Sequence, residues 1–232
     1  MAIACYLAMT AAEFSGIAVL PPSVGWLSCH FSLSGQGLSN IPKALPKDSL
    51  LILDDSNPFQ QHQPDMILEQ LQNAANALSA RALLLDFQRR DIPKVGQLAQ
   101  LLEKAMPCPV IVPPWYAKSD STLFLPPAPL YQPLERYLEP YKGRKIWLDA
   151  AFLPAQIVIT NHGSHHTHPS PDGLPAAPHW SDELCCHYGL QVEDDRAIFT
   201  FAPSSDGFQT WLHRAEVLGV EAVVGLYQEW IK

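Results

Sequence analysis

Short apolar runs with helical patterns between them are the feature of this sequence that most constrains its fold. The runs are rich in Val, Ile, Leu and aromatic residues, and apolar and polar residues hardly alternate inside them. Parallel strands that are covered on both faces have this appearance, because neither face meets water. The sequence therefore predicts seven buried strands, at residues 3–8, 50–53, 82–87, 109–112, 145–148, 197–201 and 221–227.

Three longer segments between these runs carry apolar residues at helical spacing. They begin after Pro64-Asp65, after Pro93 and after Ser205-Asp206, and the last one stops at Gly219. Ser and Asp commonly cap the start of a helix, and glycine commonly follows its last turn. A further short helix is expected at residues 134–141, so strands and helices alternate along much of the chain.

Residues 26–33, 122–125 and 156–160 resemble further strands, and seven to nine strands are expected in total. This number favours a closed (β/α)8 barrel, or a close variant that lacks a helix or two, over an open doubly wound α/β sheet. Such barrels commonly reach about 250 residues as one domain, so a single domain over residues 1–232 is expected. A Pro/His-rich loop excursion is expected near residues 156–195.

The charge balance argues against nucleic acid and membrane partners. The chain has 15 Lys and Arg against 23 Asp and Glu, a net charge of −8, and its basic residues form no run. Phosphate backbones and anionic membranes are bound through basic clusters, so neither partner is expected. Glu13 interrupts the apolar N-terminal residues before a signal-peptide core is complete. No other apolar stretch reaches the ~18–20 residues of a membrane span, and a cytoplasmic location is expected.

Cysteine and glycine patterns exclude two further classes of protein. Five cysteines are an odd number in a chain that is long enough to fold without disulfides, so reduced thiols are expected. Neither Gly-x-Gly-x-x-Gly nor Gly-x-x-x-x-Gly-Lys-Ser/Thr occurs, so the nucleotide-binding fingerprints are absent and no cofactor is expected. Buried structural roles are expected for Cys5, Cys29 and Cys108.

In a (β/α)8 barrel the functional residues stand where the strands end and in the loops that follow. At these positions the sequence has carboxylates, an amide and aromatic rings. Aromatic rings stack on the apolar faces of sugars, and carboxylates and amides bind sugar hydroxyls, so this mixture suits a carbohydrate. Capping of the following helix is an equal alternative for Asp54 and Asp55. The candidates are Asp54, Asp55, Asp86, Gln88, Trp115, Tyr116, Asp149, Tyr227, Glu229 and Trp230.

One stretch of the chain, residues 66–116, combines a helical segment, the strand Ala82-Leu-Leu-Leu-Asp-Phe-Gln88, a second helical segment and Pro109-Val-Ile-Val-Pro-Pro-Trp-Tyr116. This order resembles the centre of the family-18 glycoside hydrolases, the chitinase-like barrels. That family carries an Asp-x-x-Asp-x-Asp-x-Glu motif on such a strand. Its final Glu is the general acid, and the Asp two residues earlier orients the N-acetyl group of the substrate.

The resemblance implies a role for several individual residues. Asp86 matches the last Asp of the motif, and Gln88 stands where the family has its Glu. Arg81 and Leu84 replace the two earlier aspartates. Asp149 resembles a later strand-end Asp of the family, and Tyr227 or Trp230 would supply the aromatic floor of its sugar site.

The amide at Gln88 decides the functional expectation. It has no titratable proton for a glycosidic oxygen, and general acid catalysis supplies a factor of about 10²–10⁴. We therefore expect a glycan-binding barrel, with N-acetylated sugars favoured, whose hydrolysis is impaired or absent. An active hydrolase that uses another acid, from Glu229, Asp149 or Asp55, is an alternative. Gln88 is equally read as an ordinary strand-end amide in a barrel of unrelated ancestry.

A histidine-rich segment supplies the remaining alternatives. His162, His165, His166 and His168 are followed by His179 and by Cys185-Cys186-His187, all of which are ligand types for zinc. Their spacing matches no established zinc motif, so a solvated loop or lid is favoured over a metal site. Adjacent strand residues point to opposite faces, so neighbours such as Cys29-His30 are poor catalytic pairs. A metal-dependent hydrolase and a non-catalytic protein-interaction domain both stay open, and the oligomeric state is not predicted.

Overall fold

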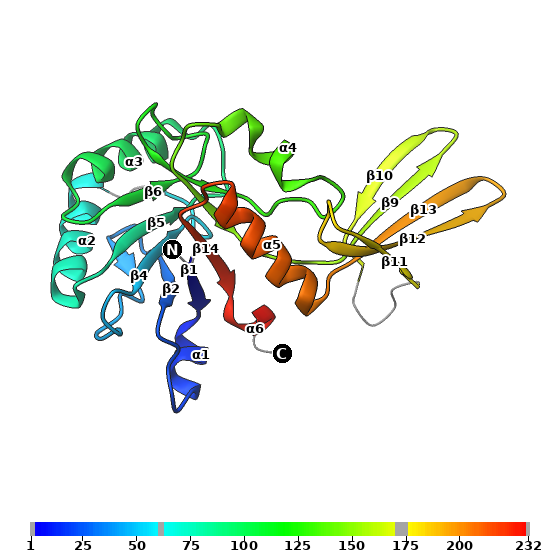
Figure 1. Cartoon of the computed structure of the whole chain (residues 1–232). Helices are drawn as coiled ribbons and strands as arrows, with labels where there is room; N and C mark the ends of the chain where they lie inside the picture. The colour runs from blue at the N-terminus through cyan, green and yellow to red at the C-terminus, as the bar shows by residue number, and fades with distance from the viewer. Residues whose placement is uncertain (1–2, 60–62, 170–175, 231–232) are drawn as a thin grey trace. The chain divides into compact units, whose positions relative to one another are not determined.

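The structure is a computed structural model that describes residues 3–59, 63–169 and 176–230 (Figure 1). Its main feature is a closed barrel of eight parallel strands, which confirms the predicted (β/α)8-type fold. The barrel closes because the first strand pairs in parallel with both the second and the last. The strands are β1 (Ala4–Met9), β2 (Val24–Phe31), β4 (Leu50–Asp54), β5 (Ala82–Asp86), β6 (Val110–Val112), β7 (Thr122–Leu125), β8 (Ile146–Asp149) and β14 (Ala222–Leu226).

Two long helices follow barrel strands where the sequence predicts them. Helix α2 (Pro64–Leu78) connects β4 to β5, and α3 (Pro93–Ala105) connects β5 to β6; both begin with a proline in the first turn. They lie side by side on the outside of the barrel (Figure 1). Short helices α1 (Ala11–Gly16) and α6 (Tyr227–Trp230) follow β1 and β14. No helix connects β2 to β4, where β3 (Leu38–Ser39) pairs antiparallel with β2, or β6 to β7, and every residue of both connections is described.

Successive residues of the barrel strands alternate between two apolar layers. Leu50 and Ile52 of β4 belong to an inner cluster with Tyr6, Trp147 and others from around the barrel. Their neighbours Leu51 and Leu53 belong to an outer cluster that includes the apolar faces of α2 and α3. This period of two explains the apolar runs in the sequence, because both faces of each strand are buried.

The chain divides into two compact units, which are described separately below. The barrel unit comprises Ala4–Pro126, Gly143–Asp149 and Glu221–Lys232, and the insert unit comprises Pro127–Lys142 and Ala150–Val220 with Met1–Ile3. The two units are each compact, and this division does not establish that either of them folds alone. The expected single domain over residues 1–232 therefore stays a prediction.

The insert unit is built on a five-stranded antiparallel sheet in the order β10-β9-β13-β12-β11. Three helical elements complete this unit, and the last of them is capped at its start by the Ser204 hydroxyl, which accepts from the Gly207 N–H. The strands are β9 (Ala155–Thr160), β10 (Gly163–Thr167), β11 (His179–Ser181), β12 (Cys186–Glu193) and β13 (Arg196–Ala202). The helices are α4 (Leu134–Leu138), the 3-10 helix η1 (Glu139–Tyr141) and α5 (Ser205–Val217).

Two expectations are wrong in this region. The described part of residues 156–195 is mainly antiparallel strand and not a Pro/His-rich loop, while residues 170–175 lie outside the described residues. The run at 197–201, predicted as a parallel barrel strand, lies in β13 and pairs antiparallel with β9 and β12. An apolar run indicates a buried strand but does not reveal the direction of its neighbours, which is the physical reason for this error.

None of the described helices combines the length and the apolar character that a bilayer crossing requires.

Candidate functional site

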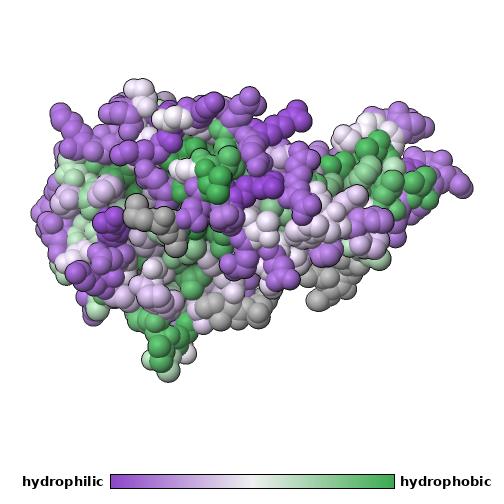
Figure 2. All heavy atoms as spheres, in the orientation of Figure 1, coloured by the Kyte–Doolittle hydropathy of each residue, from purple (hydrophilic) through white to green (hydrophobic). Residues whose placement is uncertain are grey.

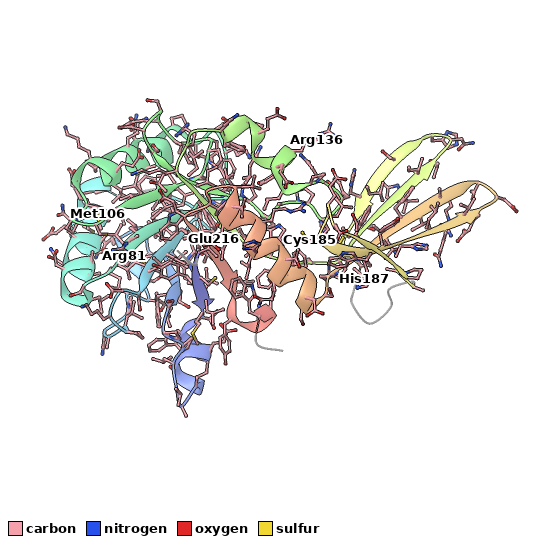
Figure 3. All side chains as sticks on the ribbon, in the orientation of Figure 1. Arg81, Met106, Arg136, Cys185, His187 and Glu216 are labelled. Atoms are coloured by element: carbon pink, nitrogen blue, oxygen red, sulfur yellow. The ribbon has the colours of Figure 1, made fainter. Side chains whose placement is uncertain are left out.

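Two aspartates are directed to the mouth of the barrel by the alternation of its strands. Asp54 lies two residues after Ile52, and Asp86 lies two residues after Leu84, and both apolar residues belong to the inner cluster. Because side chains two apart on a strand share a face, the carboxylates stand on the inner face at the strand ends. Arg81 precedes β5, at the opposite end of that strand (Figure 3).

A polar pocket of about 430 Å³ lies at these strand ends. The first four strands of the barrel and the loops after them supply its walls. At one side, the Thr10 hydroxyl caps helix α1 by accepting from the Glu13 N–H, and the Ser28 hydroxyl accepts from the Ala11 N–H at 2.8 Å. The lining residues are Thr10, Leu27, Ser28, His30, Asp54, Asp55, Ser56, Asp86, Gln88 and Arg89.

Asp55 acts as a clamp between two strand-end loops. Its side chain is only 4% exposed. One carboxylate oxygen accepts from the backbone N–H of Gln88 and the other from that of Arg89, each at 2.9 Å. The Arg89 guanidinium also donates to the Ser56 carbonyl at 3.0 Å. Both oxygens of Asp55 thus hold the loop after β5 and do not cap the helix that follows β4, whereas its predicted roles as a sugar contact or an acid stay predictions.

Asp86 and Gln88 lie together as the sequence predicts. The Gln88 side-chain amide donates to a carboxylate oxygen of Asp86. Burial raises the pKa of Asp86, the Gln88 hydrogen bond opposes this rise, and the negative charges of Asp54 and Asp55 add to it. The pocket therefore disfavours the charged form of Asp86.

His30 is a pocket residue that the sequence reasoning missed. Its Nδ1 lies 2.5 Å from a carboxylate oxygen of Asp54. Cys29, its neighbour in the chain, is buried in the outer cluster, so the two side chains do point to opposite faces. The partner is 24 residues away and is brought close by the pairing of β2 with β4, where His30 and Asp54 are register partners. A strand-end histidine at the level of strand-end aspartates is the signal that would have found it.

The remaining acidic and C-terminal candidates lie at the same end of the barrel but not in the pocket lining. Asp149 ends β8 on the face of Trp147, a member of the inner cluster. Tyr227, Glu229 and Trp230 belong to α6, which packs against β1 and β14. A Cβ atom at Gly225 would come within 2.1 Å of the Trp230 ring nitrogen, so that ring lies directly over the end of β14.

Trp115 and Tyr116 lie elsewhere. The Tyr116 hydroxyl donates to the Arg89 carbonyl at 2.8 Å and accepts from the Ile92 N–H at 3.2 Å. The Tyr116 ring packs against the outer cluster, edge-on to Phe87. The Arg90 guanidinium covers the Trp115 ring at 4.5 Å from its centroid. None of the aromatic candidates lines the polar pocket among the residues described. Stacking of Trp115 or Tyr116 on a sugar stays a prediction.

The histidine-rich segment forms a hairpin. His162 lies in the turn between β9 and β10, His165 and His166 lie in β10, and His168 follows it. Within the described ranges no three His, Cys, Asp or Glu side chains are grouped so as to hold a metal. The His166 ring instead contacts Tyr131, with ring centroids 4.7 Å apart.

The cysteines are free thiols in the described structure. Cys29 is buried as expected, whereas Cys5 and Cys108 are only half-buried. Burial raises the pKa of Cys29 to about 12. Cys185 precedes β12 and His187 lies within it (Figure 3), where the His187 ring meets Trp180.

Comparison with known proteins places the fold. The sequence matches no protein-family model and no curated protein. Solved structures do resemble it. The C-terminal domain of a putative chitinase from Desulfitobacterium hafniense has a TM-score of 0.58 at 10% identity, over all of this chain and 95% of that one. A chitinase from Chromobacterium violaceum has a TM-score of 0.53 at 10% identity, with the same coverage.

A third similar structure is the spore cortex-lytic enzyme SleL of Bacillus cereus, with a TM-score of 0.55 at 8% identity. The match covers 97% of this chain and 70% of SleL. Identities this low show the fold alone. The chain therefore shares its barrel fold with these structures, and its chemistry has to be argued from its own site.

Proposed function

We propose that the polar pocket at the barrel mouth binds a glycan, with N-acetylated sugars favoured, and that hydrolysis there is impaired or absent. The observation that carries this proposal is the Asp86–Gln88 hydrogen bond inside the pocket. A carboxylate and an amide held in contact present acceptors and donors suited to sugar hydroxyl and amide groups. The resemblance to family-18 glycoside hydrolases gives the preference for N-acetylated sugars.

Impaired hydrolysis follows from the chemistry of Gln88. Its amide takes the position that the resemblance assigns to the general acid, and an amide has no proton to give. Asp55 does not replace it, because both of its oxygens already accept backbone N–H groups. The same contacts hold the Gln88 backbone in place, so the pocket is shaped for binding even though the acid is missing.

Calorimetric titration with a chitooligosaccharide series, followed by mass analysis of the recovered sugars, tests the proposal. Saturable binding with oligomers that stay intact or are cleaved only slowly is expected. Asp86→Ala should abolish binding in a folded protein, whereas the matched control Asp120→Ala, at an exposed position after β6, should bind like the wild type. Absence of heat at every oligomer length, or unchanged affinity in Asp86→Ala, would overturn the proposal.

A further inference from the structure

Three ionisable side chains form a row across neighbouring strands at the barrel mouth. His30 of β2 is the register partner of Asp54 of β4, and Asp54 is the register partner of Asp86 of β5. All three line the polar pocket. Asp54 therefore stands between an imidazole and a second carboxylate. Its contact with His30 determines how the imidazole ring is oriented in the pocket.

The His30–Asp54 contact is held from both sides. One Asp54 oxygen accepts from Nδ1 of His30 at 2.5 Å, and the other accepts from the backbone N–H of Ser56 at 2.8 Å. The Ser56 hydroxyl lies 3.4 Å from the same Nδ1. The side chains of His30 and Asp54 are 27% and 13% exposed, so the pair is shielded but reachable. The Ser56 N–H orients the carboxylate, and the carboxylate orients the ring.

This orientation determines which ring nitrogen meets a ligand. A carboxylate only accepts hydrogen bonds, so the Nδ1 of His30 carries the proton that faces Asp54. Nε2 lies on the opposite edge of the ring and makes no hydrogen bond to any described residue. A carboxylate that fixes the tautomer and stabilises the imidazolium is how several hydrolases prepare a histidine for proton transfer.

We propose that His30, oriented by Asp54, is the proton-transfer residue of this pocket and that the slow hydrolysis left at the site proceeds through it. The inference rests on the glycan-binding function proposed above. As the glycosidic C–O bond breaks, the leaving oxygen takes the Nε2 proton of the imidazolium. Water then adds its oxygen to the anomeric carbon, and its surplus proton returns to Nε2. The net reaction is one glycan and one water giving two shorter sugars.

The other ionisable groups of the pocket are less suited to this role. Both oxygens of Asp55 already accept from backbone N–H groups of the loop after β5. The Arg89 guanidinium donates to the Ser56 carbonyl, and a guanidinium has no acceptor that could take up a proton from water. Asp86 is the one competitor, because burial raises its pKa and so favours a form that carries a proton. The experiment must therefore separate His30 from Asp86.

Two quantities are measured for each variant. Mass analysis over a long incubation gives the rate at which a chitooligosaccharide is cleaved, and calorimetry gives its Kd. His30→Gln should lower the cleavage rate by at least about 10²-fold while the Kd stays within a few-fold of the wild type. The control His213→Gln, whose side chain is 78% exposed on α5, should change neither quantity. His30→Ala should regain cleavage when free imidazole is added, and this rescue also shows that the variant is folded.

The outcomes separate the two proposals. Binding without any cleavage by the wild type overturns the role of His30 and leaves glycan binding intact, whereas no binding overturns glycan binding itself. Cleavage by His30→Gln at the wild-type rate also overturns the inference. The inference is also overturned if Asp86→Glu loses cleavage but retains binding, while His30→Gln keeps both cleavage and binding. Asp54→Asn provides a second test, because a freed imidazole should reduce the cleavage rate and leave the Kd nearly unchanged.

Discussion

The carboxylate of Asp55 accepts a hydrogen bond from the backbone N–H of Gln88 at 2.9 Å, although 33 residues separate them in the chain. Its other oxygen accepts from the next N–H, that of Arg89. Hydrogen bonds to a charged group are the stronger kind, and the loss of a buried acceptor leaves both donors unsatisfied. The position of the Gln88 side chain in the pocket therefore depends on a residue of the preceding strand end.

Asp55→Ala is expected to lower the free energy of unfolding by about 3 kcal/mol, because two charge-assisted hydrogen bonds are lost at a buried position. The same variant should weaken chitooligosaccharide binding, since the loop that carries Gln88 loses its anchor. Urea denaturation and calorimetry measure the two effects. Asp120→Ala, at an exposed position, serves as the control. A variant as stable as the wild type would show that Asp55 is no clamp.

Gln88→Glu is expected to raise the rate of chitooligosaccharide cleavage at least about 10²-fold over the wild type. The new carboxyl would lie in hydrogen-bond contact with Asp86, and two adjacent carboxyls share a proton because both cannot easily ionise. One of them would then be protonated near neutral pH and available as an acid. Gln97→Glu, on the exposed side of α3, is the matched control. Tight binding by Gln88→Glu with no gain in cleavage would contradict the assigned position of the acid.

The raised pKa of Asp86 predicts a pH-dependent stability difference. The folded protein holds this proton more tightly than the unfolded chain does. The stabilisation from Asp86 is thus complete below about pH 4, the unfolded pKa of Asp, and is lost as pH rises through the folded pKa. Asp86→Asn buries no charge at this position. Its free energy of unfolding should exceed that of the wild type by about 1 kcal/mol at pH 7, and this difference should vanish in acid. Urea denaturation at both pH values measures this, and a less stable variant at pH 7 contradicts it.

The sequence predicts the barrel well because its strands are buried on both faces, and because three of them, β4, β5 and β8, end at an aspartate. The strand ends at Asp54, Asp86 and Asp149 agree with the structure, and the first two lie together in the pocket with Asp55 and Gln88. These positions follow from strand length and period alone, which local sequence carries.

What the sequence does not predict depends on pairing between distant segments. The contact of His30 with Asp54 requires the register of β2 against β4, and this register contains an irregularity between Trp26 and Cys29. The direction of β13 likewise depends on β9 and β12, which lie on either side of it. The local sequence pattern contains neither the register of β2 against β4 nor the direction of β13. His30 was therefore missed, and the strands of the insert sheet were assigned partly to the barrel and partly to a loop.

The insert sheet has one apolar face that changes from buried to exposed along its length. Phe201 of β13 is 7% exposed and belongs to a cluster with Leu130, Ala155 and Cys186. Val192 of β12 opposes Ala197, four residues before Phe201, and is therefore on the same face but 74% exposed. Apolar side chains gather over the outer part of this sheet (Figure 2).

Substitutions at the two ends of this face should therefore differ sharply in cost. Phe201→Ala is expected to lower the free energy of unfolding by about 3–5 kcal/mol, because it leaves a cavity among packed side chains. Val192→Thr is expected to change it by less than about 0.5 kcal/mol, because its methyl groups already meet water. Urea denaturation of each variant, with amide hydrogen exchange in β12 and β13, gives the comparison. A loss of several kcal/mol in Val192→Thr would mean that this end of the face is covered in solution, since an exposed valine has no packing to lose.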